Sequence, residues 1–320
     1  IVHFKNNRWP LLKNICLLVN LAKYLQKEKF DIVHTFFHES PVYAMCALLI
    51  LRQRTILITT RRNMYHWVGE EPWKLRLLRL TNYRADYTLV NSHAVRERCI
   101  QLENLRPEKL SVIQNAIEVE KFNIISKEEA RSALKLDKNA FIVGSVGNWR
   151  PVKGMVQFLE SASILSKMIP EVHFVLVGHG PQEEDLKGMN QDNGVRGRTH
   201  FFPNNTDIPT VLAALDVAVQ PSLSESLSNV LLEYMASERP IVATRVGDAE
   251  RVIETEHDGI LVQPDNSKEM ADAIYWFYSH PDKAEKMARA SREKVKRQWS
   301  SEKILSEHIS FYSSCISRMK

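Results

Sequence analysis

The chain has 320 residues, 44% hydrophobic and 25% charged, which is typical of a globular protein with room for two domains. Its positive charge is concentrated at the start: residues 1–117 contain 18 Lys and Arg against 9 Asp and Glu, and the remainder contains 25 against 29. Such an excess is either an ordinary solvated surface or a face for an anionic partner, such as a membrane. Basic residues scattered among apolar ones, without an aromatic platform, argue against nucleic acid.

The cysteines and the apolar runs exclude further classes of protein. The longest unbroken apolar run, residues 42–51, is too short to span a bilayer. Neither a zinc site nor a disulfide framework is predicted, because the cysteines form no CxxC pair and stand far apart, at Cys16, Cys46, Cys99 and Cys315. We expect a cytoplasmic protein, and the basic first part leaves open a peripheral position on the inner face of a membrane.

Helix and strand patterns alternate through the first part. Apolar residues recur every three or four positions from Trp9 to Leu25, which predicts an amphipathic helix. Because the chain opens at Ile1 on this helix and not on a strand, we expect that an N-terminal segment is missing. Ser92 is the predicted N-cap of a helix at 94–103. The other strands and helices are expected, in chain order, at 31–35, 41–51, 55–60, 71–83, 85–92 and 109–115.

A charged stretch at 118–138 marks the predicted domain boundary. Within it, Ser126 and Glu129 have the spacing of a capping box, which predicts a short helix. We place an N-terminal domain at 1–122, a linker at 123–138, a second domain at 139–298, and a C-terminal helix that packs back toward the first domain at 299–320.

The second part alternates apolar strands with helices, which predicts a parallel sheet covered on both faces. Ligands of such sheets bind beyond the carboxyl ends of the strands. The strands are expected at 141–147, 172–177, 199–202, 217–221, 241–246 and 259–262, and the helices at 155–167, 182–189, 207–215, 227–237, 249–255 and 267–278.

Two glycine-containing turns follow the first two of these strands. GNWRPVKG at 147–154 opens a helix whose amide groups attract phosphate, and Lys153 adds a positive charge. VGHGP at 177–181 has glycines that let a ligand approach the backbone, with His179 beside them. The first turn matches neither GxGxxG nor a Walker A sequence. Each pattern is also compatible with a plain turn carrying an exposed lysine or an incidental histidine.

A third motif, SESLSNVLLE at 224–233, carries two carboxylates. Glu225 lies before a predicted helix and Glu233 about two turns inside it, where carboxylates can accept hydrogen bonds from sugar hydroxyls. Between them, Ser226, Leu227 and Ser228 are predicted to offer free amide groups to a phosphate. The plain alternative is a helix-dipole acid followed by a surface glutamate.

At this point the chain resembles the retaining glycosyltransferases of family 4, which have an E-x7-E signature like that of Glu225 and Glu233. The resemblance continues in order through DIVHT, ADYTLVNSHAV, EKLSVIQNAI, GNWRPVKG, VLVGHGP, PIVATRVGDAERVI and GILVQPDN, and so covers most of the chain. It implies an α/β protein with the GT-B fold, in which two Rossmann-like domains with parallel sheets face a central cleft. The first strand and Gly-rich loop of that fold are absent, so the N-terminal domain is expected to be incomplete.

The resemblance also implies roles for individual residues. Glu233 is expected to bind the nucleotide ribose, Glu225 the donor sugar, and Lys153 the diphosphate. Other expected donor contacts are Gly147, Asn148, Gly178, His179, Pro203, Asn204, Ser226, Leu227, Ser228 and Asn229. Catalysis is expected from Lys153, Glu225 and Arg150, the last because Asn148 stands where the family often has arginine.

On the acceptor side the chain has TTRR at 59–62 where the family often has a histidine. Arg61 or Arg62 could bind an anionic acceptor or the leaving phosphate there. His34, Asn91 and Ser92 are expected on the same side.

The function predicted is that of a hexosyltransferase, which moves a sugar from a nucleoside diphosphate donor to a hydroxyl of a saccharide or lipid-linked acceptor. Preorganised charge would stabilise the departing diphosphate, so we expect no cofactor and no metal. Two alternatives stay open: a non-catalytic nucleotide-sugar-binding protein or inactive fragment, and, less favoured, a glycoside hydrolase with two carboxylates.

Overall fold

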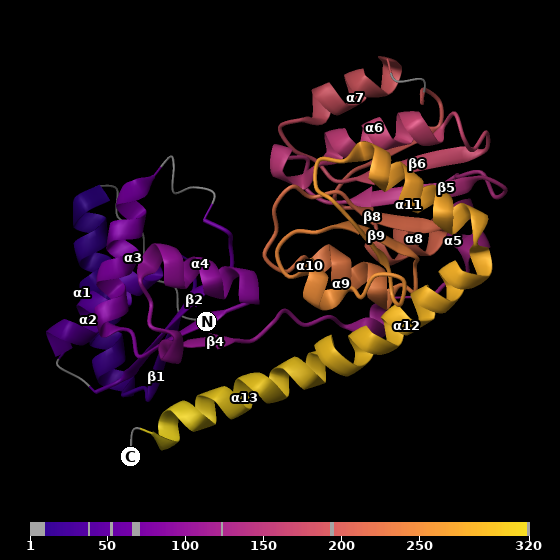
Figure 1. Cartoon of the computed structure of the whole chain (residues 1–320). Helices are drawn as coiled ribbons and strands as arrows, with labels where there is room; N and C mark the ends of the chain where they lie inside the picture. The colour runs from indigo at the N-terminus through magenta and orange to yellow at the C-terminus, as the bar shows by residue number, and fades with distance from the viewer. Residues whose placement is uncertain are drawn as a thin grey trace. The chain divides into compact units, whose positions relative to one another are not determined.

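A computed structural model describes residues 10–37, 39–51, 54–65, 71–122, 124–192 and 195–318. The chain divides into two compact units, residues 1–114 with 305–320 and residues 115–304 (Figure 1). Each unit is an α/β structure built on parallel strands, as the sequence predicts. Trp9, where the first helix was expected to begin, lies outside the described residues.

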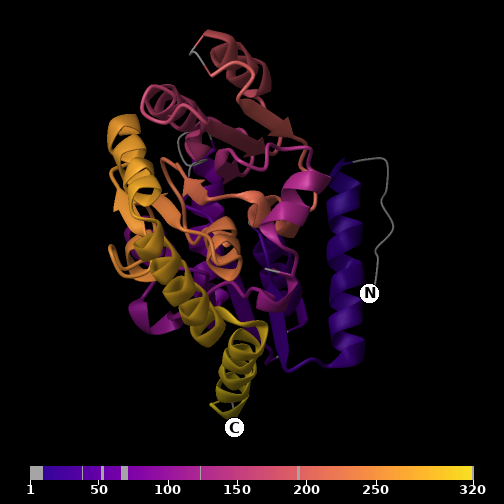
Figure 2. The same cartoon turned by 90° about the vertical axis from the view of Figure 1, so that its right-hand side faces the viewer.

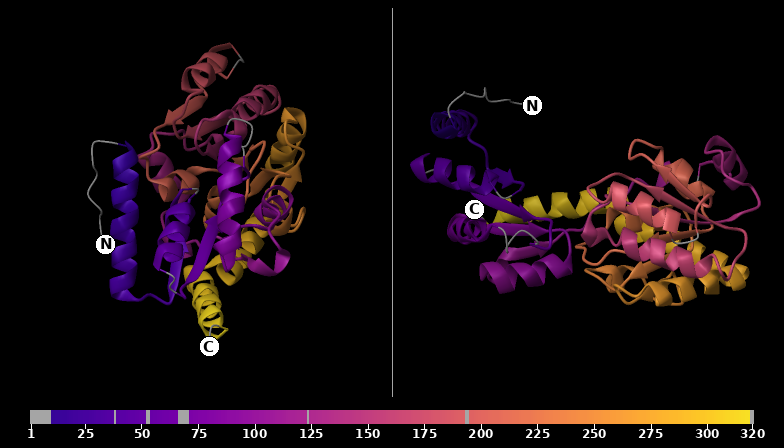
Figure 3. Two further views of the ribbon diagram at one scale, coloured as in Figure 1. Left: turned by 90° about the vertical axis from the view of Figure 1, so that its left-hand side faces the viewer. Right: turned by 90° about the horizontal axis from the view of Figure 1, so that it is seen from above.

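Within the described residues of the first unit, four parallel strands lie in the order β1-β2-β3-β4. The apolar run of β2 is buried at every position, which suits a central strand covered on both faces. α1 can be followed along its whole length in Figure 2 and in the left panel of Figure 3. The elements are α1 (Pro10–Glu28), β1 (Ile32–Thr35), α2 (Ser40–Leu51), β2 (Ile56–Arg61), α3 (Pro72–Arg84), β3 (Tyr87–Val90), α4 (His93–Glu103), β4 (Leu110–Val112) and α13 (Ser301–Ser317).

Alternation along β2 decides which helices cover each face of this sheet. Leu57 packs with the apolar residues of α1 and α2. Ile56 and Ile58, one position to either side, point to the opposite face and pack with Cys315 of α13. The end of the chain therefore contributes a covering helix to the first unit.

The second unit contains six strands among its described residues, in the order β10-β9-β8-β5-β6-β7. The chain moves outward from β5 to β7, returns to β8 on the other side of β5, and then continues to β10. The strands are β5 (Phe141–Val146), β6 (Val172–Val177), β7 (Thr199–Phe202), β8 (Val217–Gln220), β9 (Ile241–Thr244) and β10 (Ile260–Val262). This is the strand order of dinucleotide-binding folds, whose ligands bind where the winding direction reverses, here between β5 and β8.

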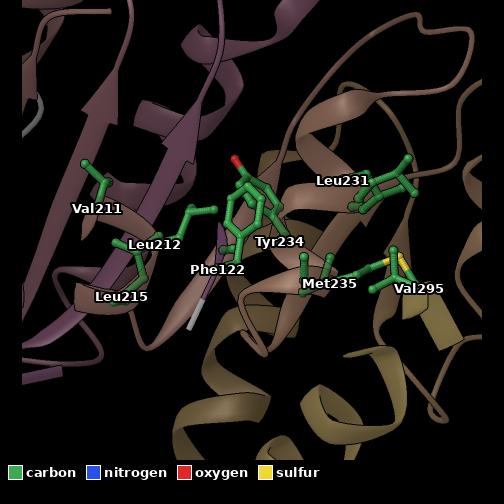
Figure 4. Close-up of a cluster of buried hydrophobic side chains, with 14 of the residues drawn as sticks. Phe122, Val211, Leu212, Leu215, Leu231, Tyr234, Met235 and Val295 are labelled. Atoms are coloured by element: carbon green, nitrogen blue, oxygen red, sulfur yellow. The ribbon is translucent and has the colours of Figure 1, made fainter. Parts of the chain in front are cut away.

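Helices cover both faces of this second sheet. Their bounds are α5 (Lys127–Ala133), α6 (Met155–Leu165), α7 (Glu183–Asp192), α8 (Ile208–Ala214), α9 (Asn229–Ala236), α10 (Ala249–Val252), α11 (Ser267–Ser279) and α12 (Pro281–Trp299). α6 and α11 share one apolar cluster, and α8, α9 and α12 share the other. Figure 4 shows part of the latter, where Leu231 and Met235 of α9 lie near Val295 of α12.

Several local details follow from side-chain chemistry. The capping box of Ser126 and Glu129 is confirmed and begins α5, which lies in the second unit inside the segment predicted to be a linker. Ser92 is confirmed as the N-cap of α4, since its hydroxyl accepts a hydrogen bond from Val95 N at 3.0 Å. α9 begins at Asn229, two residues later than predicted. In the part of the chain that the structure describes, no helix combines the length and apolar character needed to cross a bilayer.

Candidate functional site

Two loops meet at the point where the winding of the second sheet reverses. Gly154 ends the loop after β5 with φ +67°, and a Cβ there would lie 1.9 Å from the carbonyl oxygen of Pro221, at the end of β8. Leu223 N donates to Val152 O at 2.8 Å, so the loop after β8 is hydrogen-bonded to the loop after β5. Only glycine permits this approach, because any other residue would add both backbone strain and a collision.

This approach brings Lys153 and Glu225 together. The Lys153 ammonium forms an ion pair with Oε1 of Glu225, which also accepts a hydrogen bond from Ser222 Oγ at 3.0 Å. Both side chains are largely shielded from solvent, with exposed fractions of 26% and 13%. From the sequence, Lys153 was expected to bind the diphosphate and Glu225 the sugar. In the structure their charged groups are in direct contact.

A third loop, after β9, holds the backbone of Glu225. Gly247 has φ +58°, and a Cβ there would lie 2.3 Å from the carbonyl oxygens of Glu225 and Ser226. Asp248 N donates to Ser226 O at 2.9 Å. Sequence reasoning did not single out Gly247, although it lies in the quoted segment PIVATRVGDAERVI. The signal available in the sequence was a glycine directly after the predicted strand 241–246, because glycine readily adopts the left-handed φ of a tight turn.

Glu233 lies on α9 and is half-buried. Burial raises the pKa of its carboxyl group, and no described residue donates a hydrogen bond to it. The next residue, Tyr234, is fully buried; its hydroxyl accepts from Val146 N at 2.8 Å and donates to Val219 O at 3.2 Å. α9, the helix that carries Glu233, is thereby attached to the ends of β5 and β8 beside the reversal point.

The remaining predicted donor residues follow neighbouring strands. The loops after β5 and β6 are interlocked, since a Cβ on Gly178 would lie 2.0 Å from Gly147 O and Trp149 N donates to His179 O at 2.9 Å. Asn148, Arg150, His179, Pro203 and Asn204 are exposed at this carboxyl edge.

The segment before α9 differs in part from the prediction. Leu227 belongs to the hydrophobic core, so its side chain cannot contact a ligand and only its backbone remains available. Ser226 and Ser228 are buried, and Ser228 is the N-cap position of α9. The exposed Asn229 accepts a hydrogen bond from Asn115 Nδ2 at 2.6 Å. With α9 starting at Asn229, its free amide groups belong to the first helical turn and not to Ser226.

The prediction that Arg61 meets the acceptor is wrong. Arg61 is 3% exposed and pairs with Glu103 through two hydrogen bonds, at 2.7 Å from Nε and 2.9 Å from Nη2. Tyr65 and Asn82 also donate to the Glu103 carboxylate. These donors keep the pKa of Glu103 below its usual value despite burial. Arg61 is therefore part of the internal structure of the first unit.

Arg62, by contrast, is exposed and lines a small cavity beyond the carboxyl ends of β1 to β3. His34 and Asn91, two further predicted acceptor-side residues, line the same cavity together with His308 of α13. Ser92 does not: it is fully buried and used as a helix cap, which corrects its predicted acceptor role. Sequence reasoning missed His308, because nothing local connects residue 308 with β1.

His34 is held in its neutral form. Its Nε2 lies 2.6 Å from Thr60 Oγ1 and its Nδ1 lies 2.9 Å from the hydroxyl of Tyr312. Burial, with help from the nearby charges of His308 and Arg62, lowers the pKa of His34 to about 4. The neutral imidazole is thus a fixed hydrogen-bonding group between β1, β2 and α13.

Comparison with known proteins places both units in one family. The family "Glycosyl transferases group 1" matches residues 126–294, and "Glycosyltransferase Family 4" matches residues 2–121. A UDP-Gal:alpha-D-GlcNAc-diphosphoundecaprenol alpha-1,3-galactosyltransferase of Escherichia coli is 30% identical over 82% of this chain and 70% of its own length. An N-acetyl-alpha-D-glucosaminyl L-malate synthase of Bacillus anthracis is 25% identical over 93% of this chain and 78% of its own length.

Solved structures agree with this assignment at the level of the fold. Anabaena HepE, crystallised with UDP, superposes with a TM-score of 0.87 at 23% identity, covering 97% of this chain and 85% of HepE. The chain therefore belongs to glycosyltransferase family 4, the retaining glycosyltransferases with the GT-B fold.

Proposed function

We propose that the chain transfers a hexosyl group from a nucleoside diphosphate sugar to a hydroxyl group of a lipid-linked or saccharide acceptor, with retention of anomeric configuration. The observation that carries this proposal is the meeting of Lys153 and Glu225 where the winding of the second sheet reverses, beside the helix α9 that carries Glu233. The name of the Escherichia coli relative includes UDP-Gal and a diphosphoundecaprenol acceptor, and HepE has been crystallised with UDP-glucose.

In this proposal each residue binds a different part of the donor. The open carboxylate of Glu233 accepts hydrogen bonds from the ribose, and Glu225 accepts them from the sugar. Lys153 faces the diphosphate, whose negative charge grows as the bond to the sugar breaks. A preorganised cation in a partly shielded site stabilises that charge more than water does. The exposed Arg150 is in the same loop and can add to this effect. We expect the step to need neither cofactor nor metal.

The acceptor end of the reaction is assigned to the cavity of the first unit. Arg62 would bind an anionic group, such as a phosphate of a lipid diphosphate, and the buried Asn91 would bind a hydroxyl group. His34, whose two ring nitrogens are engaged by Thr60 and Tyr312, would hold this part of the cavity in place. An acceptor carried by a lipid would bring the enzyme to the surface of an anionic membrane.

Donor binding is tested by replacing Glu233 with Gln. Loss of the charged acceptor should weaken UDP-glucose or UDP-galactose binding about 10- to 100-fold in titration calorimetry. Glu184→Gln, on an exposed position of α7, is the matched control and should bind normally. Unchanged affinity in Glu233→Gln would contradict the assignment of this site.

Catalysis is tested with a UDP-sugar and a synthetic saccharide-diphosphate-polyprenol acceptor. Transfer should depend on the acceptor, retain the anomeric configuration in the product, and fall by about 10²- to 10³-fold in Lys153→Ala. Equal release of UDP without acceptor would indicate hydrolysis instead. Tight donor binding without any turnover would indicate a binding protein.

A further inference from the structure

One face of α3 in the first unit is apolar and exposed. Trp73, Leu77 and Leu80 are spaced four and three residues apart, so they lie along a single line on the helix. Their exposed fractions are 53%, 37% and 53%. The opposite face supplies contacts that hold the helix, because Leu78 and Asn82, four residues apart, are buried there. The apolar line therefore lies outside that packing face.

Two further exposed residues extend this line. Tyr83, 89% exposed, follows it near the end of the helix, and Arg76 lies beside it. Single exposed apolar side chains are common, but a row of four with two aromatic rings is the signature of an interaction surface. Trp and Tyr favour the boundary between water and a lipid bilayer, because each has an apolar body and a polar edge.

A cationic cavity adjoins the end of this row. Its volume is about 390 Å³, and its described lining includes Tyr83 and the cations Arg79, Arg106 and Lys109. Arg79 and Lys109 are held in place by backbone carbonyls: Arg79 Nη2 donates to Leu102 O at 2.6 Å, and Lys109 Nζ donates to Ala85 O at 2.6 Å.

The acid in this lining does not cancel its charge. The charge of Glu103 is neutralised by its ion pair with Arg61, and the Glu103 side chain is 0% exposed. Burial, followed by the charge of Arg106, lowers the pKa of Lys109, while Asp86 and Glu108 act in the opposite direction. Arg106 Nε lies 3.5 Å from Glu108 Oε1, but this pair is largely exposed and therefore weak, so the cations of the lining stay accessible to an anion.

We propose that the α3 surface, defined as Trp73, Arg76, Leu77, Leu80 and Tyr83 with the cavity cations Arg79, Arg106 and Lys109, docks the first unit onto a bilayer of anionic phospholipid. The apolar row enters the boundary between headgroups and acyl chains, and the cations meet the lipid phosphates. This inference rests on the proposed function, since a lipid-linked acceptor has to be reached at a membrane. It places the contact on α3 and not on the amphipathic helix α1.

The experiment is co-sedimentation of the full chain with phosphatidylcholine vesicles that contain either no anionic lipid or about 30% phosphatidylglycerol. The wild type should pellet only with the anionic vesicles. Trp73→Ser/Leu77→Ser/Leu80→Ser should lower the partition coefficient by about tenfold or more, because three apolar side chains no longer enter the bilayer. Arg76→Glu should lower it by about fivefold or more, because a charge is reversed.

A matched control tests α1. Ile15 and Val19 are also exposed apolar residues, at 53% and 44%, so Ile15→Ser/Val19→Ser tests the exposed apolar side chains of α1 and should pellet like the wild type. The proposal is overturned if the α3 variants pellet normally, if the α1 variant alone loses binding, or if neutral vesicles bind equally well. Self-association in light scattering that the α3 triple variant abolishes would instead assign the face to a second copy of the chain.

Failure of this surface and failure of the proposed function have different readouts. UDP-glucose affinity and transfer to a short, water-soluble acceptor should be unchanged in the α3 variants, since none of these residues lies in the donor or acceptor site. If transfer is absent from every variant and from the wild type while pelleting follows the predicted order, the function is wrong and the surface stands.

Discussion

Arg61 and Arg62 are neighbours in sequence with opposite environments. Arg61 is the last residue of β2. Its side chain is buried in a cluster of polar groups, where Glu103 neutralises its charge. Arg62 is exposed at the mouth of a cavity. Alternation along an extended backbone sends consecutive side chains to opposite sides, so the two guanidinium groups have different functions.

Substitution should separate these two functions. Arg61→Ala leaves the buried Glu103 without its cation and should lower the free energy of unfolding by about 3–5 kcal/mol. Arg62→Ala should change stability far less but raise KM for a diphosphate-containing acceptor. Urea denaturation and acceptor kinetics check the pair. Equal destabilisation by both variants would refute the distinction.

His34 should make the first unit sensitive to acid. Its folded-state pKa is about 4 against 6.5 for the unfolded chain, so between these values the unfolded state binds more protons. Its contribution is fully present above about pH 6.5 and is lost as the pH falls toward about 4. Replacing His34 with Gln should flatten the fall in unfolding free energy over that window. Parallel pH profiles of the two proteins, measured by urea denaturation, would contradict this expectation.

At the scale of the element, the donor site depends on loops held close together by glycine. Gly154 and Gly247 let the loops after β5 and β9 contact the loop after β8, and these contacts fix the backbone of Glu225 and the position of Lys153. The hydroxyl group of Tyr234 fixes α9 against β5 and β8 through its hydrogen bonds to Val146 and Val219. The side chains of Lys153 and Glu225, on two loops, act together because the backbones of three loops touch.

Gly154→Ala should disrupt this arrangement. A left-handed φ costs a non-glycine residue about 1–2 kcal/mol, and the collision with Pro221 O must also be relieved by moving a loop. We expect lower stability and a large loss of kcat as Lys153 shifts. Gly188→Ala is the control: it lies in α7 with nothing near its Cβ, and should be neutral or stabilising by up to about 1 kcal/mol. Thermal unfolding and turnover distinguish the two.

At the scale of the whole molecule, the last helix belongs to a unit formed mainly by the start of the chain. Residues 305–320 group with 1–114, and α13 covers Ile56, Ile58 and Leu89 of the first sheet. Two further residues of α13 contribute to the cavity region: Tyr312 is hydrogen-bonded to His34, and His308 lines the cavity. The C-terminus thus contributes both core and site to the first unit.

Truncation after Ile304 should therefore affect the two units differently. Exposing the covered face of β2 should destabilise the first unit by several kcal/mol, at about 1.5–3 kcal/mol for each large apolar side chain uncovered. Donor binding by residues 115–304 should stay within about twofold. Hydrogen exchange should accelerate in β2 but not in β5. Equal acceleration in both strands would contradict the assignment of α13 to the first unit.

Much of the fold could be predicted from the sequence by itself. The alternation of apolar strands and helices determines two parallel sheets, and it places GNWRPVKG, VGHGP and the two glutamates at the carboxyl edge of the second. The caps at Ser92 and Ser126 were also readable, because each depends on hydrogen bonds within three residues. Periodicity and capping are local, so the sequence carries them directly.

Only the tertiary structure decided which of these residues meet. The pairing of Lys153 with Glu225 depends on β8 returning beside β5, and the burial of Arg61 depends on Glu103 arriving from another helix. His308 reaches the cavity across most of the chain, and α3 exposes Trp73 because its opposite face packs inward. Such contacts join residues distant in sequence, so they depend on strand order and helix packing, which no local pattern encodes.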